Sequence, residues 1–126
     1  MQTTVFCKTK FEGVHCYPGA PDEVAYLRQP HRHMFGITVE VDVYGDDREL
    51  EFIMLKHRVD CWVRKHLNAL GVWEMEALSC EQVAIQLKAH LRAEYCDEEH
   101  NRHIIISVDE DDENGATVYG GPTYGD

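Results

Sequence analysis

The sequence contains no long hydrophobic run, and its apolar stretches fall far short of the roughly 20 residues that a membrane-spanning helix needs. The first residues, Met1 to Thr4, carry neither the basic block nor the apolar block of a signal peptide. We therefore expect a cytoplasmic protein with no membrane partner.

Cysteine pairs are also missing. The five cysteines are widely spaced and none belongs to a Cys-x-x-Cys motif, which argues against a disulfide framework or a cysteine-rich zinc site. We expect them to be reduced structural thiols, because free cysteines are among the most buried residues.

Basic residues are few. The chain has 12 Lys and Arg against 23 Asp and Glu, which gives a net charge of −11. Nucleic-acid binding depends on clustered Lys and Arg, so we expect no nucleic-acid partner. A phosphorylated substrate would have to be met by local basic groups, because the overall field repels it.

Two segments alternate apolar and polar residues as strands do. The first spans residues 3–16, and His15 continues the more apolar face that begins with Val5 and Phe11. The second spans residues 33–44, where the alternation is regular from Phe35 to Val43. Between them, residues 17–30 contain three of the four prolines and are predicted to form a long loop.

The second half of the chain has helix signals followed by strand signals. Apolar residues three and four apart predict a helix from about residue 51 to 70, with Gly71 at its C-terminal cap. Ser79 and Gln82 have the spacing of a capping box and predict the start of a second helix. Strands are expected over 103–109 and 116–119, around an acidic turn that ends in the hairpin signal Asn114-Gly115.

The predicted order of elements is therefore ββααββ. Two hairpins and two consecutive helices imply an α+β fold, with a four-stranded antiparallel sheet and two helices on one face. At 126 residues the chain is long enough for one domain, which we place at residues 1–120, and residues 121–126 are expected to form an irregular tail.

Three histidines are the strongest chemical signal. His15 ends the first predicted strand, and His31 and His33 lie where the second begins, two residues apart and so on one face. If these strands are antiparallel neighbours, the three imidazoles converge, and three imidazoles with an open fourth position are typical of a catalytic zinc site. The alternative is two surface histidines in a loop and one histidine in the core.

Five segments carry a resemblance that covers nearly the whole chain. They are Phe11-Glu12-Gly13-Val14-His15, His31-Arg32-His33, Leu50-Glu51-Phe52-Ile53-Met54-Leu55-Lys56, Leu78-Ser79-Cys80-Glu81-Gln82-Val83-Ala84, and Val108-Asp109-Glu110 with Gly115 and Tyr119. In this order they resemble the 6-pyruvoyl-tetrahydropterin synthase and 6-carboxy-tetrahydropterin synthase (QueD) family, with Arg32 in place of the Gly of its His-Gly-His motif.

The resemblance implies a T-fold (tunnelling fold), whose subunits join their sheets into a barrel, typically as a homohexamer of two trimers. It implies Zn²⁺ bound by His15, His31 and His33, and a lyase acting on a dihydroneopterin-triphosphate-like or related pterin or purine metabolite, as in 7-deazaguanine (queuosine-type) biosynthesis. It also implies that Glu110, with Asp111 as the competing candidate, binds the ring N–H groups of that substrate.

Two departures from the family pattern affect the catalytic groups. Leu27 stands about where the family has a proton-transferring cysteine, and residues 63–68 contain no Asp-His pair in the place of the family's relay. His66 is the candidate catalytic residue there, with Glu23 and Tyr26 as weaker candidates for carrying a proton. A second hypothesis is therefore a catalytically inactive T-fold protein that binds a pterin or nucleotide without turnover.

Overall fold

The computed structural model describes residues 2–45 and 47–120 of the chain. The predicted tail at 121–126 lies outside the described residues. The elements, in chain order, are β1 (Thr3–His15), the 3₁₀ helix η1 (Asp22–Arg28), β2 (His31–Val43), α1 (Phe52–Arg64), β3 (Val72–Glu76), α2 (Cys80–Tyr95), β4 (Ile104–Glu110) and β5 (Asn114–Gly120).

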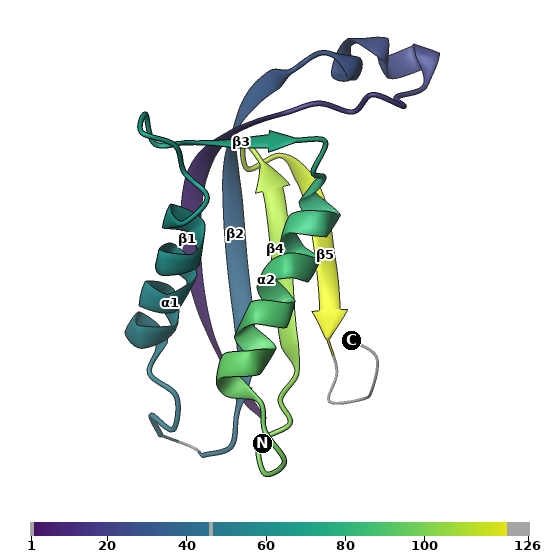
Figure 1. Cartoon of the computed structure of the whole chain (residues 1–126). Helices are drawn as coiled ribbons and strands as arrows, with labels where there is room; N and C mark the ends of the chain where they lie inside the picture. The colour runs from purple at the N-terminus through teal and green to yellow at the C-terminus, as the bar shows by residue number, and fades with distance from the viewer. Residues whose placement is uncertain (1, 46, 121–126) are drawn as a thin grey trace.

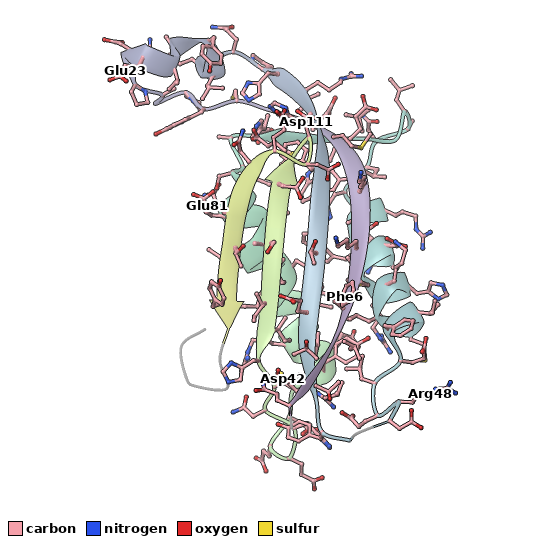
Figure 2. All side chains as sticks on the ribbon, turned by 180° about the vertical axis from the view of Figure 1, so that it is seen from behind. Phe6, Glu23, Asp42, Arg48, Glu81 and Asp111 are labelled. Carbon is pink, nitrogen blue, oxygen red and sulfur yellow. The ribbon has the colours of Figure 1, made fainter. Side chains whose placement is uncertain are left out.

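The architecture is one sheet with α1 and α2 covering one of its faces (Figure 1), which confirms the predicted α+β fold. Among the described residues the sheet has five strands in the order β3-β1-β2-β4-β5. Alternate residues of β2 from Phe35 to Val41 are buried, as are Leu55 of α1 and Leu87 of α2. The core therefore lies between the sheet and the helices, and the opposite sheet face is open, with Phe6 and Asp42 on that side (Figure 2).

The prediction of four strands, all antiparallel, was wrong. β3 adds a fifth strand, which pairs in parallel with the end of β1. The predicted helix over 51–70 is also too long, because α1 ends at Arg64. The side chain of Asn68 then accepts hydrogen bonds from the backbone N–H groups of Leu70 and Val72, which reverses the chain before β3.

The second helix begins as predicted. The Ser79 hydroxyl accepts a hydrogen bond from the Gln82 N–H, and the Gln82 side chain accepts one from the Ser79 N–H, which completes the capping box. This start matters for the site described below, because it fixes the carbonyl of the preceding residue, Leu78.

The β4–β5 hairpin turns at a different place from the one predicted. Asn114 already pairs with Glu110 inside the ladder, and the chain reverses over residues 111–113. Asp111 and Asp112 have φ angles of 57° and 59°, a left-handed conformation that Asp tolerates better than most residues. Gly115 is required for a different reason, because a Cβ there would lie 2.1 Å from the Val108 carbonyl oxygen.

The segment between β1 and β2 forms an arm that projects from one end of the sheet (Figures 1 and 2). The predicted loop contains the helix η1, and the Arg28 guanidinium donates two hydrogen bonds to the Ala20 carbonyl to close the arm on itself. No helix within residues 2–45 and 47–120 has the length and apolar character needed to cross a membrane.

Candidate metal centre

The three histidines meet at the end of the sheet where the arm begins. β1 and β2 are antiparallel, and their register places His15 directly opposite His31 and Gly13 opposite His33. The strand pairing that was expected from the sequence is therefore present. β2 begins at His31, two residues earlier than predicted, so both histidines of the pair lie on a strand and on one face.

The imidazoles are close enough to share one ion. One ring nitrogen from each of His15, His31 and His33 lies within 4.8 Å of the other two. The ring of Phe35 packs edge-on against His15 and His33, with centroid distances of 5.1 and 5.7 Å. An apolar ring therefore supports the cluster from the core side, and His15 itself is only 8% exposed.

Each imidazole has its Nδ1 atom engaged. The Nδ1 of His15 lies 2.8 Å from the Leu78 carbonyl oxygen, and that of His31 lies 2.8 Å from the Gln29 carbonyl oxygen. The Nδ1 of His33 lies 2.7 Å from the Asp111 carboxylate. A carbonyl oxygen only accepts, so Nδ1 carries the hydrogen in His15 and His31, and a carboxylate acceptor implies the same for His33.

This arrangement leaves the Nε2 lone pairs free to bind a cation. In the part of the chain that the structure describes, the Nε2 atoms of His15 and His33 are buried and have no hydrogen-bond partner. A buried polar atom without a partner is costly, whereas metal-binding histidines characteristically donate their other N–H to a carbonyl or carboxylate. Three imidazoles in this arrangement therefore fit a zinc ion.

Two neighbouring carboxylates from the β4–β5 hairpin complete the surroundings. Glu110 ends β4, and its oxygens lie 3.0 Å from the Nε2 of His15 and 3.5 Å from the Nε2 of His33. Asp111 lies one residue later, where its carboxylate also accepts a hydrogen bond from the Met34 N–H. Hydrogen bonds from Met34 and from His33 lower the pKa of Asp111, so it is ionised.

Arg32, the departure from the His-Gly-His motif, does not disturb the cluster. It lies between the two histidines in the strand and therefore points to the opposite face. There its guanidinium pairs with Glu12 at 2.6 Å.

His66 lies apart from the three histidines. Its Nδ1 donates to the Trp62 carbonyl oxygen, and its ring stacks on Trp73 with a centroid distance of 4.2 Å. Three rings, Trp73, Phe11 and Phe35, follow one another in contact between His66 and His15. Within one chain, therefore, the structure does not bring His66 to the cluster, and its catalytic role stays a prediction.

The other candidate proton carriers are also separate from the cluster. Glu23 and Tyr26 belong to η1, and Figure 2 places Glu23 at the far end of the arm from Asp111. Cys80, which sequence reasoning did not select, lies at the start of α2 and is buried. Burial, together with nearby charges led by Glu110, raises the pKa of the Cys80 thiol to about 12, so it supplies no thiolate at neutral pH.

Sequence reasoning missed the groups that hold the histidines. Leu78 and Gln29 contribute carbonyl oxygens, which leave no trace in residue identity. Asp111 was considered only as a substrate ligand. An acidic residue directly after β4, the strand that pairs with β2, could have been predicted to accept the hydrogen bond of His33.

Comparisons with known proteins identify the fold. No protein-family model matches the sequence, and no curated protein matches it either. The fold is nevertheless the T-fold of the 6-pyruvoyl tetrahydropterin synthases.

Two solved structures show this likeness. The chain is similar to the 6-pyruvoyl tetrahydropterin synthase of Plasmodium falciparum, with a TM-score of 0.70 and 16% identity, over 95% of this chain and 98% of that one. It is also similar to a catalytic-residue mutant of the Plasmodium vivax 6-pyruvoyltetrahydropterin synthase, with a TM-score of 0.69 and 12% identity, over 96% and 99% of the two chains.

Proposed function

We propose that the chain is a zinc-dependent lyase of the 6-pyruvoyl/6-carboxy-tetrahydropterin synthase type. The observation that carries this proposal is the common state of the three imidazoles, each with Nδ1 bound to an acceptor. Two of the Nε2 atoms, those of His15 and His33, are also buried without a hydrogen-bond partner among the described residues, and one ring nitrogen of each histidine lies within 4.8 Å of the other two. The likeness in fold to two 6-pyruvoyl tetrahydropterin synthases supports the reaction class.

In this proposal His15, His31 and His33 hold the ion and the chain orients the substrate around it. When bound, zinc supplies Lewis-acid polarisation of a hydroxyl or carbonyl oxygen. The substrate is a dihydroneopterin-triphosphate-like or related pterin or purine metabolite, and Glu110 accepts hydrogen bonds from the N–H groups of its ring. His66 moves protons beside the substrate carbonyl, before a carbon–carbon bond or the phosphate is lost.

We further propose that the chain works in the cytoplasm as a homo-oligomer, a hexamer of two trimers, in 7-deazaguanine (queuosine-type) biosynthesis. β3 and β5 support the assembly, because they are the edges of the sheet in the described residues. Edge strands present backbone groups that pair readily with another copy. Since His66 is remote from the cluster within one chain, its participation requires a neighbouring copy or a rearrangement.

A specific observation favours a second candidate function, a T-fold protein that binds a pterin or nucleotide without turning it over. Leu27 occupies the approximate position of the expected cysteine. Cys80, a thiol whose pKa is raised first by burial and then by the charge of Glu110, is held protonated. This candidate keeps the metal centre and the substrate site but has no proton carrier.

Metal analysis tests what both candidates share. Freshly purified, unchelated protein should contain about one zinc per chain, because neutral imidazole sites bind zinc tightly. His31→Ala should lose most of it, whereas His57→Ala, which removes an exposed histidine of α1, should retain it. Less than about half an equivalent of any metal in the wild type would contradict both candidates.

Turnover separates the two candidates. Purified protein is incubated with dihydroneopterin triphosphate, and products are followed by mass spectrometry. A product that forms with the wild type and disappears with His31→Ala would exclude the binding-only candidate. Tight binding of a pterin with no product would contradict the lyase.

A further inference from the structure

Glu110 lies where a ligand of the metal would lie. Its carboxylate contacts two of the three histidines, with oxygens 3.0 Å from the Nε2 of His15 and 3.5 Å from the Nε2 of His33. Glu110 lies on β4 and not on the strands that carry the histidines. Its register partner is Phe35 on β2. The side chain is 28% exposed, so Glu110 lies between these two histidines and solvent.

These contacts are not hydrogen bonds. Both Nε2 atoms are buried and without a hydrogen-bond partner among the described residues, although a carboxylate oxygen lies 3.0 Å from one of them. The oxygens therefore lie off the axis along which a ring N–H would point. Nδ1 of both rings donates to another acceptor, so in the neutral tautomer that binds metals the Nε2 lone pairs face the same space as the carboxylate.

A cation bound by both the Nε2 atoms and the Glu110 carboxylate would relieve the repulsion between their lone pairs. In a tetrahedral site with Zn–N and Zn–O distances near 2.0 Å, adjacent ligand atoms are about 3.3 Å apart. The two separations from Glu110 to the histidines, 3.0 and 3.5 Å, lie on either side of that value. Carboxylates of Asp and Glu are accepted zinc ligands beside imidazole.

We propose that Glu110 is a fourth protein ligand of the resting metal centre. The inference rests on the proposed function, because it requires the ion, and it adds a step to it. With the ion bound, Glu110 would occupy the fourth position in the absence of substrate. Its carboxylate would have to release the ion in order to turn both oxygens to the N–H groups of the substrate ring.

Cobalt(II) binding to the full-length protein tests this without any substrate. The variants are Glu110→Gln, which keeps the shape of the side chain, Glu110→Ala, which removes it, and Glu113→Gln as the control. Glu113 is exposed in the turn of the same hairpin, where it contacts Glu110 through its backbone N–H, so its substitution removes the same charge and leaves that contact in place. Visible absorption gives the cobalt affinity and the coordination, and circular dichroism checks that each variant is folded.

We expect both Glu110 variants to bind cobalt at least about tenfold more weakly than the wild type, a loss of the size seen when even outer partners of a metal site are removed. Glu113→Gln should match the wild type. Azide, as an exogenous ligand, should change the cobalt spectrum of Glu110→Ala at about tenfold lower concentration than that of the wild type, because the fourth position is then open.

Equal cobalt affinity and equal azide response in the wild type and both Glu110 variants would overturn the inference. His31→Ala is measured in parallel. If it abolished cobalt binding while the Glu110 variants did not, the three-histidine centre would be supported without Glu110 as a ligand. Failure of the wild type to bind cobalt or zinc would overturn the centre and this inference together. Equal losses in Glu110→Gln and Glu113→Gln would assign the effect to net charge and would also overturn it.

Discussion

The Nδ1 of His33 donates to the Oδ2 of Asp111 at 2.7 Å, and the Oδ1 of the same carboxylate accepts from the Met34 N–H at 2.9 Å. One side chain thus fixes both the ring of a candidate ligand and the backbone of the strand that carries it. The Asp111 N–H in turn donates to the Met34 carbonyl oxygen, so the hairpin tip and β2 are joined three times within two residues.

Asp111→Asn should weaken zinc binding by about 10- to 100-fold, the usual cost of losing a partner of a metal-bound histidine. Asn tolerates the left-handed backbone at this position, so the turn survives and the change is confined to charge and acceptor geometry. Competition with a chromophoric chelator measures the affinity. Asp112→Asn is the matched control, since it removes only the exposed pair with Lys10; equal effects of the two substitutions would contradict the prediction.

Gly13→Ala should lower the free energy of unfolding by about 1–3 kcal/mol, the typical cost of overpacking. A Cβ at Gly13 would lie 2.6 Å from the Met75 Sδ and 2.9 Å from the Phe35 ring. Phe35 supports His15 and His33, so zinc affinity should fall as well. Urea denaturation and zinc competition measure the two effects. Gly19→Ala meets only Tyr17 at 3.7 Å and should leave both unchanged; a neutral Gly13→Ala would show that the packing relaxes freely.

Acid should weaken the fold through Glu49. The Arg102 guanidinium, which is 6% exposed, holds both Glu49 oxygens at 2.7 and 2.8 Å and lowers the pKa of Glu49 from 4.5 to about 2. A carboxyl whose pKa is depressed in the folded state stabilises the fold above its unfolded pKa. That contribution is lost as the pH falls from about 4.5 to 2.

Glu49→Gln measures this contribution. At pH 6 the substitution should cost about 1.5–3 kcal/mol, the range for a hydrogen bond to a charged group. The difference between wild type and variant should shrink as the pH falls toward 2.5. Urea denaturation at a series of pH values gives both curves, and a difference that does not change with pH would contradict the assignment.

His66→Phe tests the predicted catalytic role. Phenylalanine keeps a ring against Trp73 but removes both nitrogens, so a general acid–base role should show as a loss of about 10²- to 10⁴-fold in turnover. Zinc content should not change, because no contact of His66 described above reaches the cluster. The control is His57→Phe at an exposed position of α1. Undiminished turnover in His66→Phe would remove His66 from the mechanism.

The sequence predicted the histidine cluster because its geometry is local. His31 and His33 share a face by the two-residue period of a strand, and the antiparallel pairing of consecutive strands brings in His15. The capping box of α2 was equally local, since it depends only on Ser79 and Gln82.

β3 escaped prediction for the opposite reason. Its five residues are too few for the alternation of Trp73 and Met75 with Glu74 and Glu76 to identify a strand. It forms because the edge of β1 can pair with it, and this depends on the tertiary structure and not on the local sequence. Missing β3 also meant missing part of the site, since β3 leads directly to Leu78, whose carbonyl oxygen accepts the hydrogen bond of His15.

The acceptors for His15 and His31 belong to the main chain, whereas the acceptor for His33 is a side chain. No substitution deletes a carbonyl oxygen, so mutational scanning should rank positions 29 and 78 as tolerant and position 111 as sensitive, although all three do the same work. The orientation of the His15 and His31 rings therefore depends on the backbone conformation and not on the identity of residues 78 and 29. Among homologues that keep the fold while their sequences diverge, the His33 hydrogen bond should be the first of the three to be lost.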